Sequence, residues 1–312
     1  MIAFSILQWM RRESPAPEVS YSSIPITSAI GDEGNVTWSP EGEFIAFQRM
    51  REGSYDIMVQ PIAGGEAVVR AGGPGDEQAP RWSPDGKYLA YVSTSEPGSF
   101  VYLVPPHGGA PRKLISTEIP TLASAYLAMS MGVHPWSLDS RTLLVARVGD
   151  LGRQAIFRVD RDNGAAEQLS FPPAGVDDFS PSYSFDGERI AFVRGSETDG
   201  NLMTMAATGD DPELLQTDAL HPSFRPDDRH LLFISGRKDG ATNLWELELE
   251  TGALRQLTSD SRQQGWAFSV SATNRIAFQD FWHDTFLFVV DVDSGERRQL
   301  TSHTKARDTD HG

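Results

Sequence analysis

The sequence contains no cysteine among its 312 residues. This absence excludes disulfide bonds, a thiolate nucleophile and zinc sites built on cysteine ligands. Basic residues are also scarce, since 27 Lys and Arg stand against 43 Asp and Glu, giving a formal net charge of −16. Nucleic-acid binding needs clustered Lys and Arg to replace phosphate counterions, and here the basic residues are scattered. The composition therefore argues against a nucleic-acid partner and favours an acidic, solvated surface.

Two signatures of catalytic or metal sites are missing as well. No Gly-x-Ser-x-Gly pentapeptide is present, so the nucleophile elbow of an α/β-hydrolase has no counterpart. No Asp-rich loop with the ligand spacing of a calcium site occurs either. Carboxylates such as Asp177-Asp178 and Asp227-Asp228 fall in links between expected strands, where solvated turn residues are common. The sequence thus predicts no catalytic residue, no metal ligand and no cofactor.

A ten-residue pattern organises the residues that are present. It is clearest at residues 82–91, which read Trp-Ser-Pro-Asp-Gly-Lys-Tyr-Leu-Ala-Tyr. Pro84 presets φ for a tight turn, Asp85 can bond its own backbone, and Gly86 accepts a positive φ. The alternation of large and small residues after the turn is typical of a strand. The pattern therefore predicts two strands joined by a reversing turn.

Related segments recur at intervals of 41 to 54 residues, and each copy starts with an aromatic residue. The aromatic residues of the first five copies are Trp38, Trp82, Trp136, Tyr183 and Phe224. In a sixth copy, Phe268 takes this role only if one residue has been inserted. Each copy continues with a third apolar segment, a Gly-centred turn and a short fourth segment. Four-stranded repeats of this length are typical of a β-propeller, in which the aromatic side chains fill the space between stacked sheets.

We therefore predict an all-β fold, a β-propeller of six four-stranded blades, with an incomplete seven- or eight-bladed ring as the alternative. Residues 23–28 resemble a further fourth strand, one more than six blades need. We expect it beside the third strand of the sixth repeat or outside the fourth strand at 297–301, because a covered edge resists aggregation. Contact between residues 35–39 and 266–270 would indicate a closed ring.

The expected propeller spans residues 22–302, with a leader and linker at 1–21 and a polar tail at 303–312. Residues 1–10 are apolar, and Arg11-Arg12 follow them. Ten residues are too few to cross a bilayer as a helix, and a signal peptide carries its charge before the apolar run. The run is interpreted as the end of a membrane helix, as a short apolar cap or as a disordered leader, and we favour the membrane helix.

Residues near the expected axis are candidate ligand contacts. The first strands place Asn35, His134, His221 and Trp266 as lining of a central channel. The two histidines stand at different offsets from their aromatic residues, so in regular strands their imidazoles face opposite sides. This argues against a two-histidine metal site. The longest insertion, residues 115–135, is either a functional loop or a tolerated surface excursion.

The Trp-Ser-Pro-Asp-Gly motif, the Gly-Gly turns and the Arg-x-Leu segments resemble the WD-like repeat of TolB-type β-propellers across residues 22–302. Residues 25–28, 102–109 and 171–175 are similar to the extracytoplasmic propellers of bacterial transmembrane regulators, in which a winged-helix or kinase domain precedes one membrane helix. Neither of those two domains has a motif in this sequence. The resemblance implies a sensory or protein-interaction role and fixes no ligand residue.

Two functions from different classes remain open. We favour a non-enzymatic, extracytoplasmic propeller that binds a protein, a peptide or a small ligand in its central channel, with a membrane tether at its N-terminus. The alternative is an enzyme, either a hydrolase or lyase with a metal in the central channel or the gating propeller of a prolyl-oligopeptidase-like enzyme. Metal analysis and a thermal shift on chelation distinguish the first enzyme alternative from the binding propeller.

Overall fold

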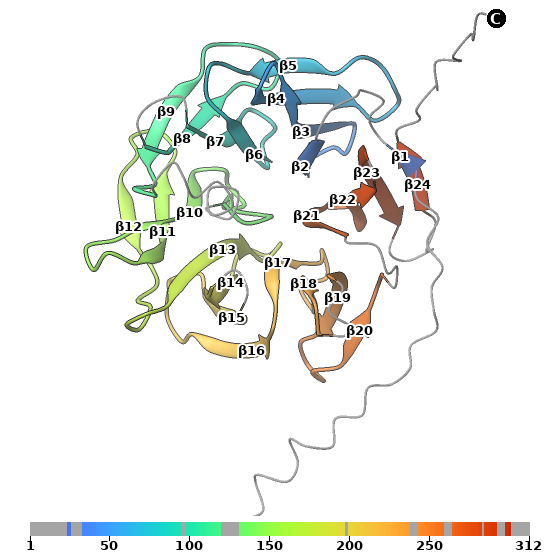
Figure 1. Ribbon diagram of the computed structural model, residues 1–312. Coiled ribbons are helices and arrows are strands. Elements are labelled where there is room, and N and C mark those ends of the chain that lie inside the picture. The colour runs from blue at the N-terminus through green and yellow to red at the C-terminus, as the bar shows by residue number, and fades with distance from the viewer. Residues whose placement is uncertain are drawn as a thin grey trace, which may run out of the picture.

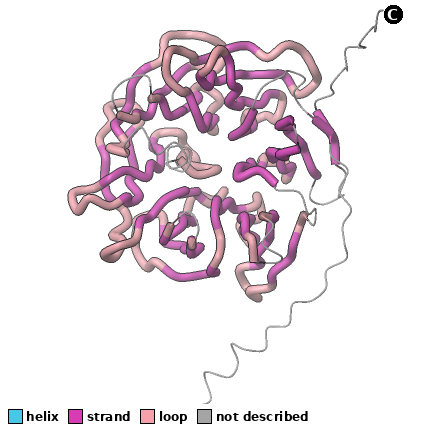
Figure 2. The backbone as a smooth tube through the Cα atoms, viewed as in Figure 1, coloured by secondary structure: helices cyan, strands magenta, loops and turns pink. Residues whose placement is uncertain are grey.

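A computed structural model describes residues 24–25, 33–94, 98–119, 131–196, 199–237, 242–258, 264–282, 284–291 and 297–300. Every regular element in these ranges is a strand (Figure 2). The strands form six sheets that surround a common axis (Figure 1). This arrangement confirms the prediction of an all-β propeller built from four-stranded sheets.

Four sheets contain four strands in sequence order. The first contains β2 (Glu33–Trp38), β3 (Phe44–Arg51), β4 (Ser54–Pro61) and β5 (Val68–Ala71). The second contains β6 (Glu77–Trp82), β7 (Leu89–Ser93), β8 (Phe100–Val104) and β9 (Arg112–Ser116). The fourth contains β13 (Asp177–Tyr183), β14 (Arg189–Gly195), β15 (Gly200–Ala206) and β16 (Glu213–Thr217). The fifth contains β17 (Leu220–Phe224), β18 (His230–Ser235), β19 (Asn243–Glu248) and β20 (Leu254–Gln256).

The third sheet departs from the predicted four strands. It contains only β10 (Thr142–Val148), β11 (Gln154–Asp160) and β12 (Ala166–Gln168). The segment that precedes β10 makes a single isolated bridge, between Trp136 and Leu143. Pro135 lies just before that bridge and has no N–H to continue a ladder. The inner strand of this sheet is therefore reduced to one bridge, because its residues follow another path toward the axis.

The last sheet has five strands in the order β1, β24, β23, β22, β21. Its members are β1 (Ile24–Pro25), β21 (Gln264–Val270), β22 (Arg275–Trp282), β23 (Asp284–Asp291) and β24 (Arg297–Leu300). The N-terminal strand β1 pairs in parallel with β24, with Ile24 opposite Gln299. The extra strand thus adds outside the fourth strand, which confirms one of the two predicted positions. It covers an outer sheet edge that would otherwise be open to another chain.

The aromatic residues that start the repeats pack between neighbouring sheets, as predicted. Trp82 shares a buried core with Ala46 and Ile57 of the first sheet, and Trp136 shares one with Ala90 of the second. The same holds for Tyr183 against the third sheet and Phe224 against the fourth. Trp38 packs in the same way with Ala277 of the last sheet. Each aromatic side chain therefore joins its own sheet to the preceding one.

The sixth copy differs from the sequence prediction at this position. In the first and second sheets the aromatic residue pairs with the start of the next strand, Trp38 with Ile45 and Trp82 with Leu89. The residue in that register in the last sheet is Val270, which pairs with Ile276. The interpretation of Phe268 as the aromatic equivalent was wrong, because the turn in this copy is one residue shorter rather than longer. Val270 still packs against the fifth sheet, beside Leu232.

The first and last sheets also meet. Strand β2 contacts β21, which is the contact predicted for a closed ring. The guanidinium carbon of Arg275 lies 4.8 Å from the centre of a Trp38 ring. The terminal segments 1–21 and 303–312 lie outside the described residues, as do residues 120–130 of the long insertion.

Candidate functional site

The turns between the first and second strands are the local structures that build one end of the ring. In the second sheet the Ser83 N–H donates to the Tyr88 carbonyl and the Gly86 N–H donates to the Ser83 carbonyl, both at 2.9 Å. The Ser83 hydroxyl donates to an Asp85 carboxylate oxygen at 2.7 Å. Gly86 has φ 71°, as the turn motif predicts. A positive φ recurs at the equivalent position of the other copies, at Gly42, Ser140, Gly187, Asp228 and Asn274.

These turns surround a pocket of about 240 Å³ that five of the sheets line. We call it the axial pocket. Its walls are the residues at the start of the repeats, Trp38, Trp82, Trp136, Tyr183 and Val270. Its rim consists of turn residues, namely Ser39, Pro40, Pro84, Leu138, Ser184, Phe185, Ser271 and Ala272. Leu138 is 67% exposed, although it is a large apolar side chain. His134 also lines the pocket and is the one basic side chain among the described lining residues.

The segment before β10 passes close to the axis. Val133 packs in a core with Leu232 and Phe268 of the fifth and last sheets, far from its own sheet in the ring (Figure 1). A Cβ added to Gly132 would lie 2.0 Å from the Pro181 carbonyl oxygen, so only glycine permits this approach. The same segment ties to the fourth sheet, because the His134 N–H donates to the Ser182 hydroxyl at 3.1 Å. This segment therefore connects the third sheet with the fourth, fifth and last sheets.

Arg81 holds this segment from the second sheet. Its guanidinium donates to main-chain carbonyl oxygens of Gly132, of Pro80 at 2.8 Å and of Met131 at 3.4 Å. The side chain is 5% exposed, and burial lowers its pKa to about 10, so it keeps its charge at neutral pH. No carboxylate in the described part of the chain forms an ion pair with it. Three carbonyl dipoles, rather than a counter-ion, stabilise this buried charge.

The positive charge of Arg81 acts on both candidate histidines. Burial, and then the charge of Arg81, lowers the pKa of His134 to about 4, against a main-chain hydrogen bond with Val270 that raises it. The pKa of His221 falls to about 4 for the same two reasons. The assumption of a regular strand fails at His221, because its φ is 50° and the register shifts between Leu220 and Ser223. Both imidazoles are neutral at physiological pH.

The other two predicted lining residues have different environments. The Asn35 side-chain amide donates to Gln48 Oε1 at 2.8 Å, and the same oxygen accepts the Ala79 N–H at 3.1 Å. Asn35 is thereby tied to the junction of the first two sheets. Trp266 falls within β21, and its side chain lies outside the described residues. Sequence reasoning missed Arg81, although an arginine stands where the other copies have Thr37, Pro135, Ser182, Ser223 and Ser269.

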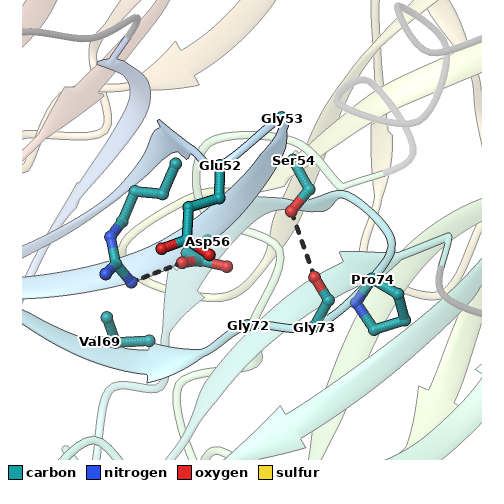
Figure 3. A pocket seen from close by; sticks show the side chains of 9 residues that line it. Glu52, Gly53, Ser54, Asp56, Val69, Gly72, Gly73 and Pro74 are labelled. Carbon is teal, nitrogen blue, oxygen red and sulfur yellow. Dashed lines mark hydrogen bonds and ion pairs between the residues drawn. The ribbon is translucent and has the colours of Figure 1, made fainter.

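A second pocket, of about 550 Å³, lies at the opposite end of the first sheet. Its wall comes from the β3–β4 turn and from the link between β5 and β6, including Gly72 and Gly73 (Figure 3). Arg51 Nη1 pairs with Asp56 Oδ2 at 2.8 Å inside it, and the Ser54 hydroxyl donates to the Gly73 carbonyl at 3.2 Å. We call it the Asp56 pocket. It is polar, whereas the axial pocket is mainly apolar.

No group of three or more His, Asp or Glu side chains that could hold a metal ion occurs in the described ranges. Within those same ranges, no helix has the length and apolar character needed to cross a membrane.

Comparison with known proteins supports the fold. One curated relative, dipeptidyl-peptidase 5 of Porphyromonas gingivalis, is 27% identical over 195 residues, which cover 55% of this chain and 27% of that protein. The chain thus matches about a quarter of that relative's length. TolB from Acinetobacter baumannii superposes with a TM-score of 0.64 at 16% identity, covering 86% of this chain and 62% of TolB.

Enzymes share this fold as well. An oligogalacturonate lyase solved in complex with manganese has a TM-score of 0.58 at 16% identity, over 92% of this chain and 87% of the lyase. A puromycin-hydrolyzing peptidase of Mycobacterium tuberculosis has a TM-score of 0.56 at 16% identity, over 92% of this chain and 50% of the peptidase. At such identities these likenesses show the fold alone. The TolB beta propeller domain model matches residues 35–221, more than half of the sequence, and the chain therefore belongs to the TolB β-propeller domain family.

Proposed function

We propose that this chain is a non-enzymatic interaction propeller that binds a segment of a partner protein in its axial pocket. The observation that carries the proposal is the aromatic wall of Trp38, Trp82, Trp136 and Tyr183 beneath an exposed Leu138. Exposed apolar surface beside a concave aromatic site is typical of a protein-interaction surface. Aromatic anchors also contribute much of the binding energy at such surfaces.

The charge state of the pocket supports an apolar contact. His134 is a basic side chain in the lining, and its lowered pKa of about 4 leaves it neutral at pH 7. Among the lining residues that the structure describes there is no Asp, Glu, Lys or Arg. An apolar side chain of a partner therefore enters without stripping water from a charged group, a step that would cost binding energy.

Three further parts of the proposal concern the whole chain. We propose that the six sheets are the six blades of a closed ring, which the contact between β2 and β21 supports. Residues 22–302 then form the propeller, 1–21 a leader that tethers it to a membrane, and 303–312 a tail. We propose an extracytoplasmic location for the propeller, in line with its membership of the TolB domain family.

Site-specific photo-crosslinking tests the partner-binding role. A photoreactive amino acid at Leu138 lies on the rim of the axial pocket, and one at Leu151 serves as the matched control, since its side chain is 74% exposed on a turn at the other end of the third sheet. We expect a discrete crosslinked protein at Leu138 in cells that express the chain, and its loss when Trp136 is replaced by alanine. Equal crosslinking at the two positions contradicts the proposal.

A metal measurement separates the enzyme alternative. Elemental analysis of purified protein and a thermal melt with and without chelator are expected to show no stoichiometric divalent ion and no shift. A bound ion together with a large chelator effect would support a metal-dependent lyase or hydrolase instead.

A further inference from the structure

An acid–arginine pair recurs at the start of the inner strands. Glu33 lies opposite Arg49 across β2 and β3, and their side chains meet at 2.6 Å. Asp178 lies opposite Arg194 across β13 and β14, and the guanidinium donates to both carboxylate oxygens at 2.7 and 2.8 Å. Both carboxylate side chains are fully buried. The fold thus places a guanidinium against a buried carboxylate at this register.

The second sheet keeps the acid and lacks the arginine. Glu77 holds the acidic position, and the residue opposite it is Ser93. Glu77 is 4% exposed, and its Oε1 accepts a hydrogen bond from the Ser93 hydroxyl at 3.1 Å. Its Oε2 is buried and has no hydrogen-bond partner in the described part of the chain. Burying a carboxylate without a cation beside it costs free energy of folding. Glu77 therefore lacks the positively charged partner that the equivalent acids have in the first and fourth sheets.

The Asp56 pocket lies directly beside this carboxyl group. A Cβ added to Gly73, which lines the pocket, would stand 3.8 Å from Glu77 Oε1. A Cβ added to Gly72 would stand 2.4 Å from Asp56 Oδ1. Gly72 therefore leaves room for the Asp56 carboxyl group in the pocket wall (Figure 3), and the Glu77 carboxyl group lies in van der Waals range of the Gly73 Cβ position. Asp56 is 8% exposed, its Oδ2 accepts a hydrogen bond from Arg51, and its Oδ1 lies next to the Cβ position of Gly72.

We propose that the Asp56 pocket binds the guanidinium group of an arginine side chain presented by a partner protein, which supplies the cation that Ser93 does not. A planar guanidinium matches carboxylate geometry, as the pair of Asp178 and Arg194 already shows in this chain. The carboxylates of the pocket are not grouped as metal ligands in the described residues. The net charge of −16 favours the approach of a basic partner.

Binding at this site is also expected to depend on pH, because it is coupled to the loss of a proton from Glu77. Burial, and then the negative charges of Asp56 and Asp76, raises the pKa of Glu77 to about 7, against the lowering effect of the Ser93 hydroxyl. Tyr91 also faces it, and its own pKa is raised by burial and by Glu77. A guanidinium binds the ionised carboxylate, so binding strengthens as the pH rises from 6 to 8 and releases a proton from Glu77.

The test is an NMR titration of the full chain with N-acetyl-arginine amide at pH 8, with N-acetyl-citrulline amide as the neutral isostere. We expect saturable shifts at Gly72 and Gly73 with the arginine probe, at least about tenfold tighter than with citrulline, as charge-assisted hydrogen bonds imply. Glu77→Gln should weaken arginine binding about tenfold and remove its pH dependence. Glu41→Gln changes an exposed acid on a turn at the other end of the sheet and should have no effect.

Ser93→Arg is the decisive variant, because it restores inside the chain the arginine found at 49 and 194. It should abolish binding of the probe and raise the unfolding midpoint. If the Ser93→Arg protein does not fold, the loss of arginine binding in the isosteric Glu77→Gln variant still tests the proposal. Absence of saturable shifts, equal affinity for arginine and citrulline amides, or unchanged binding in a folded variant overturns the proposal. The axial-pocket proposal is separate, since crosslinking at Leu138 does not depend on Glu77.

Discussion

Replacing Trp82 by alanine tests whether the aromatic residue at the start of each repeat holds neighbouring sheets together. The indole is 8% exposed, and it shares a buried core with Ala46 and Ile57 of the preceding sheet. Its ring stacks with Phe44 at a centroid distance of 6.5 Å. Its indole N–H is buried and has no hydrogen-bond partner among the residues that the structure describes, so the substitution removes apolar contact there.

The expected loss follows from the buried area. Burying a tryptophan side chain removes about 200 Å² of its surface from water. At about 25 cal/mol per Å², this corresponds to a transfer free energy of about 5 kcal/mol. Measured losses for Trp→Ala in cores run from about 3 to 5 kcal/mol, because the surrounding structure relaxes in part. We therefore expect Trp82→Ala to lower the free energy of unfolding by about 4 kcal/mol.

Urea denaturation followed by circular dichroism measures this loss from the midpoint and the slope of the transition. Leu151→Ala is the matched control, because its side chain is 74% exposed and its loss should stay within about 0.5 kcal/mol. A loss at Trp82 below about 1.5 kcal/mol, or equal to that at Leu151, would refute the reasoning that this indole joins two sheets.

Three further outcomes are expected. Gly132→Ala should lower the thermal midpoint strongly, because the new Cβ would stand 2.0 Å from the Pro181 carbonyl oxygen. An unchanged thermal midpoint would contradict the close approach of residues 131–136 to the fourth sheet. Trp136→Phe should cost about 1 kcal/mol more than Trp82→Phe in urea titrations, since only Trp136 donates its N–H to the Arg81 carbonyl, at 3.2 Å. The raised pKa of Glu77, about 7, means that the folded state holds this proton more tightly. Stability from this group is therefore present below about pH 4 and lost as the pH rises toward 7, and Glu77→Gln should flatten that decline in urea midpoints between pH 5 and 8.

The repeated turn motif was enough to predict the fold because its information is local. Each turn needs a residue that tolerates a positive φ, and Gly86 supplies it by lacking a Cβ. The aromatic residue before each turn is large and apolar, so its burial between sheets follows from its position in the repeat. The outer place of β1 was one of two positions expected from the need to cover a sheet edge.

The tertiary structure decided what depends on distant segments meeting. The path of residues 131–136 toward the axis has no periodic signal, because it rests on contacts with distant segments, such as the close approach of Gly132 to Pro181 and the hydrogen bonds from Arg81. The environment of His221 depends on a bulge that breaks the strand period, and on Arg81 from another sheet. Val270 replaced Phe268 in the register because a turn one residue shorter shifts the pairing.

The amino-acid sequence by itself determined the strand repeat, the buried aromatic positions and the acidic surface, since these follow from side-chain size, turn chemistry and charge. Only the tertiary structure decided which side chains line the axial pocket and that Glu77 stands beside Gly73 without an arginine opposite it. The physical reason is that a pocket wall and an unpaired buried charge are properties of neighbours in space. Residues from five sheets meet at the axial pocket, and their spacing along the chain does not predict that they meet.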